Sequence, residues 1–248
     1  MSQLDLALAA RVSSRHLSYV ETGRAQPSRD MVLLLVEVLD VPLRERNTLL
    51  QAAGFAPRFR ETALTAPALE PVRRSIEFML EHHNPYPAVL VDRHWNLLMQ
   101  NRASAALLPR FIAAPQAMQP PLNGMRLLFK REGLRPFICN WEEVAAAMIQ
   151  RLHREAALAG NDEGTVALLK ELLDVEGVPA DWRKPDYAHE HPVIISIQIK
   201  RDDLELNLFS AITTLGTPLD ITLQELRLET FFPADAATDK AVRSLLKC

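Results

Sequence analysis

The sequence contains little cysteine, little glycine and no long apolar run. It has 2 Cys among 248 residues, Cys139 and Cys248, which are too few and too isolated for a disulfide framework or a thiolate metal site. Its 8 Gly are scattered, so there is no glycine-rich phosphate loop. No apolar run approaches the roughly 18 residues of a membrane span, and the N-terminus lacks a signal-peptide pattern. We therefore expect a cytoplasmic protein without a membrane partner.

An excess of basic charge is also lacking. The net charge is -3, and residues 1–57 carry six Arg against six Asp or Glu. Because DNA-binding proteins normally gain much of their affinity by neutralising phosphates, composition alone does not indicate nucleic-acid binding. With 48% hydrophobic and 24% charged residues, the chain has an ordinary globular composition, and its length allows about two domains of roughly 100–200 residues each.

The first residues have the pattern of a capped helix. Ser2 is a favourable N-cap, and Asp5, three residues later, can act as the acidic partner of a capping box. Leu4, Leu8 and Val12 recur at helical spacing, which predicts an apolar stripe facing the core.

A second short helix follows a turn at Val12-Ser13. Its spacing predicts that Leu17 and Val20 face inward, whereas a polar face points outward, and Gly23 ends the helix. That face consists of Ser14, Arg15, Ser18 and Tyr19. Such a face suits the major groove of DNA, because an arginine can bind guanine edges in a bidentate manner. The alternative is an ordinary helical hairpin with a solvated polar face.

The order of these residues resembles the lambda-repressor-like, or XRE-family, helix-turn-helix proteins. Ser2-Gln3 opens the first helix of the motif, and Glu21-Thr22-Gly23 closes the recognition helix. The resemblance implies binding to double-stranded DNA. The family fold has five helices and we count four, so we expect the first helix to be missing. The expected DNA-binding residues are Gln3, Ser14, Arg15, Ser18, Tyr19, Arg24 and Arg29.

Two further helices complete a predicted all-α domain over residues 1–57. One spans about Arg29 to Leu39, with an apolar stripe of Met31, Leu34, Leu35 and Val38, and the other spans Leu43 to Ala53. Residues 58–68, rich in Pro, Thr and Ala, are predicted to be a linker. The second domain is then expected to span residues 69–248.

The second domain begins with a predicted helix over about 69–83. A strand over 88–91, a turn at Asp92-Arg93-His94, a second strand and a helix capped by Asn101 follow, as at the entry of a PAS-like sensor domain. Two more helices are predicted near 141–159 and 163–173. Alternating apolar residues then predict strands at 195–199, 204–208 and 221–228, the last with a bulge near Gln224-Glu225.

The predicted fold class is therefore α+β with two domains. An all-α helix-turn-helix bundle precedes a PAS-like antiparallel sheet with helices on one face.

Large apolar side chains are spread between the predicted sheet and its helices, where they can line a ligand cavity. The alternative is that they fill the core completely, because apolar stripes are usually core. Asn101 or Arg102 can meet a carboxylate head group, although each also suits a cap or a surface position. The expected ligand-binding residues are Trp95, Met99, Asn101, Arg102, Phe111, Phe129, Trp141, Met148, Ile197 and Leu208.

Over residues 2–232 the chain resembles the MmyB-like transcription regulators. The matching motifs are Pro42-Leu43-Arg44-Glu45-Arg46-Asn47, Ala52-Ala53-Gly54-Phe55-Ala56-Pro57, Pro85-Tyr86-Pro87-Ala88, Val91-Asp92, Asn101-Arg102-Ala103, Asn140-Trp141 and His191-Pro192-Val193. The resemblance implies a bacterial transcription factor that forms a homodimer. It also implies a second domain that dimerises and holds a fatty-acid-type apolar ligand.

Other functions were weighed against this interpretation. An enzyme needs a nucleophile–base constellation, a metal set or a phosphate loop, and none is evident, so we expect no catalysis and no cofactor other than a bound fatty acid. His189 and His191 have a spacing that can bind metal, but no third ligand is evident. The main rivals are a PAS-like sensor of haem or flavin and a purely dimerising second domain.

Overall fold

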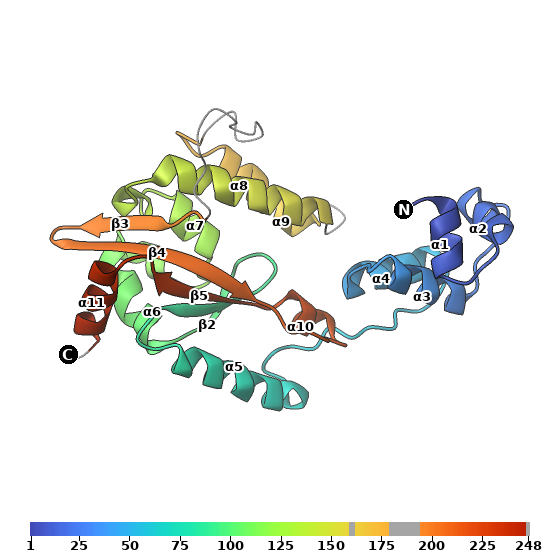
Figure 1. Ribbon diagram of the computed structural model, residues 1–248, viewed down its shortest axis with the longest axis horizontal. Helices are drawn as coiled ribbons and strands as arrows, with labels where there is room; N and C mark the ends of the chain where they lie inside the picture. The colour runs from blue at the N-terminus through green and yellow to red at the C-terminus, as the bar shows by residue number, and fades with distance from the viewer. Residues whose placement is uncertain (159–161, 179–193, 247–248) are drawn as a thin grey trace. The chain divides into compact units, whose positions relative to one another are not determined.

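A computed structural model describes residues 1–158, 162–178 and 194–246 (Figure 1). The chain divides into two compact units. The first, the helical unit, comprises Met1–Ala63 together with Leu215–Gln224. The second, the sheet unit, comprises Leu64–Thr214 and Glu225–Cys248.

Short capped helices build the helical unit. They are α1 (Gln3–Ala9), α2 (Ser14–Glu21), α3 (Arg29–Val38) and α4 (Leu43–Ala52), with most of α10 (Ile221–Glu225). The predicted capping box is confirmed, because Ser2 Oγ accepts from the Asp5 amide at 3.2 Å and the Ser2 amide donates to the Asp5 carboxylate at 3.0 Å. Ser13 caps α2, and Gly23 ends it at a φ of 71°, a left-handed conformation that favours glycine.

The predicted apolar stripe of α1 is wrong by a rotation of the helix. Ala7 is buried with Leu17 and Met31, whereas Leu4 and Leu8 are 59% and 69% exposed. The small Ala7 side chain lets α1 approach its neighbours closely, so the alanine row faces the core. The stripe of α3 is confirmed at Met31 and Leu35, but Leu34 is exposed, and Val32 and Val36 are buried instead.

A segment distant in sequence, Leu215–Gln224, completes the helical unit. Thr62 Oγ1 donates to Asp220 Oδ2 at 2.6 Å, and the Leu43 amide at the start of α4 donates to Gln224 Oε1 at 2.6 Å. The contact satisfies an amide in the first turn of α4, which has no intrahelical partner. The helical unit is therefore closed by the connection between two strands of the sheet unit.

The sheet unit contains five strands and a layer of helices. The strands are β1 (Ala88–Val91), β2 (Leu97–Gln100), β3 (Ile197–Arg201), β4 (Leu204–Thr213) and β5 (Arg227–Pro233). The α-helices are α5 (Glu70–His82), α6 (Arg102–Leu107), α7 (Gly124–Phe129), α8 (Trp141–Leu158), α9 (Glu163–Leu173) and α11 (Ala236–Leu245). Single 3-10 turns occur at Pro67–Leu69, Leu108–Phe111, Pro115–Met118 and Arg135–Phe137. Within the described ranges, no helix has the length and apolarity needed to cross a membrane.

The strands form one antiparallel sheet in the order β2-β1-β5-β4-β3, which places β5 at its centre. The strand predicted over 221–228 is wrong in its first half, where the structure has the short helix α10. Asp220 causes this change, because its carboxylate accepts from the Thr222 amide at 2.9 Å and starts a helical turn. The strand β5 then begins at Arg227, and no bulge is needed near Gln224.

Most helices of the sheet unit cover one face of the sheet. Figure 1 shows α7, α8 and α9 on one side and α5 on the other. Side-chain contacts agree with this arrangement. The ring of Phe232 stacks on that of Phe209, with 5.5 Å between the ring centroids. It also contacts the ring of His83, the C-cap of α5, with 4.9 Å between the centroids. Phe231, the preceding residue, points to the opposite face, because side chains alternate along a strand.

Asn101 joins three elements on its own. Its side-chain oxygen accepts hydrogen bonds from the amides of Ala88 at 3.0 Å and Ser104 at 2.9 Å. Its side-chain nitrogen donates to the carbonyls of Leu80 at 3.2 Å and Tyr86 at 2.8 Å. The residue is 4% exposed, so these four hydrogen bonds replace water at the end of α5, the start of β1 and the first turn of α6.

We predict that Asn101→Ala lowers the free energy of unfolding by about 2–4 kcal/mol, because a helix cap is lost and buried backbone groups lose their partners. Asn101→Asp keeps the acceptor and loses the donors, so its loss should be intermediate. Urea unfolding of both variants measures this order. A loss under about 1 kcal/mol for Asn101→Ala would show that water replaces the side chain.

Candidate functional sites

The helix α2 presents the polar face that its spacing predicts. Ser14 and Arg15 are exposed, Ser18 and Tyr19 are half-buried, and Leu17 is buried beneath them. Arg15 Nε donates to Tyr19 Oη at 3.0 Å, and the guanidinium lies 5.5 Å from the centre of the Tyr19 ring. The two side chains therefore form one polar surface, in which the ring limits the rotamers of Arg15.

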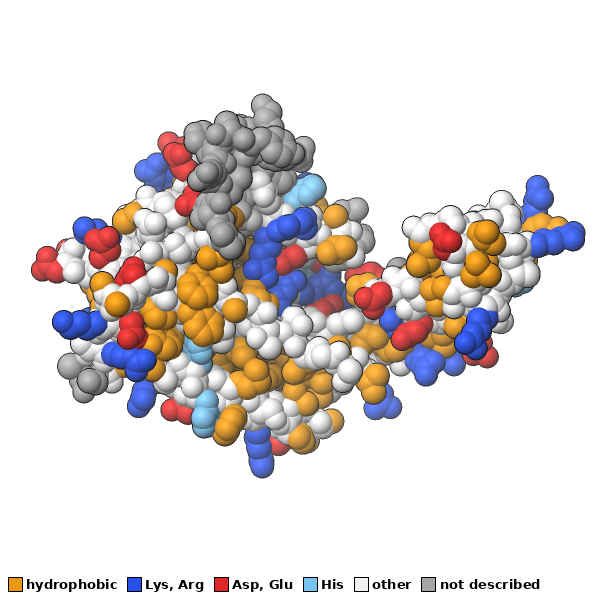
Figure 2. Space-filling view, in the orientation of Figure 1, with side chains coloured by type: hydrophobic (Ala, Val, Ile, Leu, Met, Phe, Trp, Pro, Cys, Tyr) orange, Lys and Arg blue, Asp and Glu red, His pale blue; other side chains and the backbone are white. Residues whose placement is uncertain are grey.

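The arginines of residues 1–57 fall into two groups. Arg44 pairs with Glu61 and Arg46 with Glu37, so both are engaged within the helical unit. In the part of the chain that the structure describes, the other four arginines form no ion pair, and these are Arg11, Arg15, Arg24 and Arg29. Figure 2 shows basic side chains projecting from the end of the helical unit that carries α2. The even charge balance therefore still leaves basic groups available around α2.

Gln3, which we expected at the DNA, is engaged inside the motif. Its side-chain amide donates to the carboxylate of Glu21 and thereby connects the start of α1 to the end of α2. The hydrogen bond connects the two helices of the motif and uses one of the two N–H donors of the exposed Gln3 side chain.

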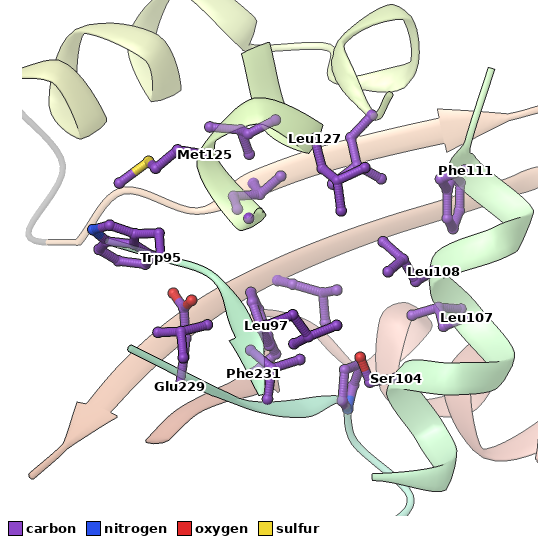
Figure 3. Close-up of a pocket in the computed structure, with 18 of the residues that line it drawn as sticks. Trp95, Leu97, Ser104, Leu107, Leu108, Phe111, Met125, Leu127, Glu229 and Phe231 are labelled. Atoms are coloured by element: carbon purple, nitrogen blue, oxygen red, sulfur yellow. The ribbon is translucent and has the colours of Figure 1, made fainter. Parts of the chain in front are cut away.

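The sheet unit contains an apolar cavity of about 180 Å³ between the sheet and its helices (Figure 3). All five strands contribute to one wall, and α6, α7 and α8 contribute the other. The lining residues are Pro87, Val89, Val91, Trp95, Leu97, Ser104, Leu107, Leu108, Phe111, Gly124, Met125, Leu127, Leu128, Leu134, Met148, Ile197, Ile199, Leu208, Glu229 and Phe231.

The structure brings half of the predicted ligand-binding residues to this cavity. Those that line it are Trp95, Phe111, Met148, Ile197 and Leu208. Trp95 is held at a φ of 66°, which is uncommon for a bulky residue. Strain of this kind is typical of functional positions.

The other five predicted residues lie outside the cavity lining. Asn101 uses its polar atoms as the cap described above, and Arg102 is exposed on α6. Phe129 and Trp141 pack against each other within the core, with 5.9 Å between their ring centroids. A bulge near Leu98 shifts the register of β2, so that Met99 pairs with Leu90. As a result, the Met99 side chain lies on the face of the sheet opposite to the cavity.

Sequence reasoning missed the two polar side chains of the cavity, Ser104 and Glu229. Glu229 was missed because the alternation of β5 was read from Leu226 and Leu228, which lie on the other face. Because β5 is the central strand of the sheet, its residues on the face of Phe231 point toward the cavity, and Glu229 is the one charged residue type among them that lines it.

A polar cluster lies at the Trp95 end of the cavity. Glu155 of α8 accepts hydrogen bonds from Trp95 Nε1 at 3.0 Å, Arg151 Nε at 2.9 Å and Arg227 at 2.8 Å. Arg151 and Arg227 also lie over the Trp95 ring, at 4.7 and 5.4 Å. The ring is therefore fixed by three charged side chains.

Glu229 lies beside this cluster without joining it. Ser210 Oγ donates to Glu229 Oε1 at 2.7 Å, and in the described residues Glu229 forms no ion pair. Burial raises the pKa of the Glu229 carboxyl above its usual value, and the hydrogen bond from Ser210 and the charges of Arg151 and Arg227 offset this only in part.

Metal binding finds no support in the residues that can be judged. His189 and His191 lie outside the described residues, as does the His191-Pro192-Val193 motif. In the described ranges, no three side chains of His, Cys, Asp or Glu gather as metal ligands.

The fold and its two sites define a class of protein: a helix-turn-helix unit followed by a PAS-like domain with an apolar cavity. Comparison with family models agrees. Residues 1–46 match a helix-turn-helix model, and residues 72–245 match the MmyB-like transcription regulator ligand binding domain. The chain belongs to the family of MmyB-like transcription regulators. It is therefore a DNA-binding transcription regulator with a ligand-binding domain.

Comparison with individual proteins adds little. No curated protein matches the chain. A solved structure described as an RNA-binding light-oxygen-voltage receptor aligns at 12% sequence identity with a TM-score of 0.31, over 99% of this chain and 60% of the other. The chain thus spans about three fifths of that receptor.

We predict that Glu229→Gln changes the pH dependence of stability. In the native protein the folded state holds the Glu229 proton to a higher pH than the unfolded chain does. The free energy of unfolding should therefore fall as pH rises from about 4.5 through the raised pKa. The variant should lose this part of the slope and be the more stable protein at neutral pH.

Urea unfolding across that pH range measures the effect, and Glu205→Gln, at an exposed position of β4, should leave the slope unchanged. Equal slopes in the native protein and Glu229→Gln would contradict the prediction.

Proposed function

We propose that this regulator binds operator DNA as a homodimer and that a small apolar ligand, fatty-acid-like in its chain, occupies the cavity of the sheet unit and modulates DNA binding. The observation that carries the proposal is that one chain holds both the Arg15–Tyr19 surface on α2 and an apolar cavity in the sheet unit. Ligand can change DNA affinity only by binding one arrangement of the protein better than another.

The exposed face of α2 suits direct reading of bases. Arg15 and Tyr19 act as one unit that reaches base edges, with Ser14 and Ser18 beside them. Arg24 and Arg29 follow α2 and precede α3, where they suit phosphate contacts. Gln3 contributes through its hydrogen bond to Glu21, which holds the motif together. Two copies would read half-sites about 34–36 Å apart, one helical turn of DNA.

We predict that Arg15→Ala weakens operator binding by about 1–3 kcal/mol and relaxes the preference at one base position. Selection from a random DNA library identifies the operator, and fluorescence anisotropy with single-base variants then measures the effect. A uniform loss over all sequences would show that Arg15 contacts the backbone instead of a base.

Arg24→Ala is the matched control, because it removes one exposed arginine outside the α2 face. We expect it to weaken binding to all sequences by a similar factor and to reduce the slope of log affinity against log salt by about 1. An unchanged salt slope would exclude a phosphate contact by Arg24.

The cavity favours an apolar ligand over haem or flavin. Haem requires an axial ligand such as His or Cys, and neither residue type lines the cavity in the described part of the chain. Its volume of about 180 Å³ also lies below the roughly 300–1,000 Å³ of sites for larger ligands. A purely dimerising domain would have no need for a strained Trp95 at the wall of a cavity.

We predict that native mass spectrometry of the purified full chain shows a dimer carrying a small apolar molecule, which organic extraction releases. Leu208→Trp should abolish this mass while leaving the secondary structure intact, because Leu208 lines the cavity and a larger side chain fills it. A coloured protein with the spectrum of haem or flavin would refute the apolar-ligand proposal. A bound mass that persists in Leu208→Trp would place the ligand elsewhere.

A further inference from the structure

Glu229 is the single ionisable side chain on the cavity wall within the described residues. It projects from the central strand β5, and Figure 3 shows its carboxyl group on the side of the cavity below the Trp95 ring. A lone carboxyl group on an apolar wall is the strongest chemical feature that a ligand in this cavity meets. The head group of the ligand is therefore recognised at Glu229.

The cations near Glu229 are engaged by another carboxylate. Arg151 and Arg227 both bind Glu155, at 2.9 and 2.8 Å. With Trp95 Nε1 as a third donor, the charge of Glu155 is fully paired. Glu229 keeps only the hydroxyl of Ser210, so its second carboxyl oxygen remains for a ligand.

The charge of a ligand head group is restricted by these neighbours. The groups that face Glu229 are Arg151 and Glu155 from α8, Arg227 on its own strand and Ser210 from β4. An ammonium head group would approach two guanidinium groups, whereas an ionised carboxylate has no hydrogen to donate to the carboxyl oxygen of Glu229. Bringing like charges together, or burying a charge without an unpaired partner, is costly out of water. An uncharged hydroxyl head group avoids both conflicts.

The size of the ligand is restricted as well. An apolar cavity of about 150 Å³ holds one benzene molecule. The cavity of about 180 Å³ therefore holds roughly six to eight non-hydrogen atoms of a ligand.

We propose that the cavity selects a short apolar ligand with one uncharged hydroxyl head group, an alcohol or an undissociated acid, which donates a hydrogen bond to the second carboxyl oxygen of Glu229. This inference rests on the proposed ligand-binding function and adds the chemistry of the head group. The carboxyl oxygen that Ser210 does not reach can accept from such a hydroxyl group.

The test uses three probes with the same six-carbon chain: 1-hexanol, hexanoate and hexylamine. Isothermal titration calorimetry of the full chain is done at neutral pH, where hexanoate and hexylamine are both ionised. We expect 1-hexanol to bind more tightly than either charged probe by on the order of tenfold or more. Tighter binding of hexanoate would overturn the proposal in favour of arginine recognition, and tighter binding of hexylamine would overturn it in favour of an ionised Glu229.

Two variants identify the residue. Glu229→Gln keeps an acceptor oxygen and adds an amide donor, so 1-hexanol binding should change by less than about threefold, whereas hexanoate binding should improve because its carboxylate accepts from that donor. Glu229→Leu should weaken 1-hexanol binding by roughly three- to tenfold. If Glu229→Leu does not fold, the hexanoate affinity of Glu229→Gln decides, and no improvement there would overturn the role of Glu229. Glu205→Gln, at an exposed position of β4, should leave all three affinities unchanged.

Failure of the inference is distinct from failure of the proposed function. If the folded protein binds all three probes equally, the cavity is a ligand site but Glu229 does not select the head group. If it binds none of them, the cavity is no ligand site for short chains, and both the apolar-ligand proposal and this inference are refuted.

Discussion

The four hydrogen bonds of Asn101 are the constraint on which the ligand-binding domain depends. They fix the end of α5, the start of β1 and the first turn of α6 in one place. Two of these elements form the cavity, since Val89 and Val91 come from β1 and Ser104 and Leu107 from α6. A single amide side chain, buried and fully bonded, thus sets the distance between two walls of the site.

Local signals predicted most of the secondary structure and little of the side-chain orientation. Caps such as Ser2, Ser13 and Asn101 act within a few residues, so the sequence identifies them directly. The bulge that turns Met99 away and the choice of Ala7 over Leu4 as the buried residue depend on partners distant in sequence. Glu229 escaped prediction for the same reason, because its importance follows from the central position of β5.

In both units, ion pairs engage some of the charged residues and leave others without an oppositely charged partner among the residues that the structure describes. In the helical unit, acidic residues engage Arg44 and Arg46 and leave the arginines around α2 for DNA. In the sheet unit, Glu155 engages Arg151 and Arg227 and leaves Glu229 outside their ion pairs. The net charge of the chain does not reveal either arrangement, because the charge available to a partner depends on which residues form ion pairs in the folded protein.

The connection between β4 and β5 makes the two units inseparable by a single cut of the chain. The backbone leaves the helical unit at Ala63, returns at Leu215 and leaves again at Gln224. A fragment that ends in the linker would lack the segment that bonds to Thr62 and Leu43. The complementary fragment would carry that segment without its partner. The chain therefore passes between the two units three times. We expect the two units to unfold with more cooperativity than two domains that are joined by a single linker.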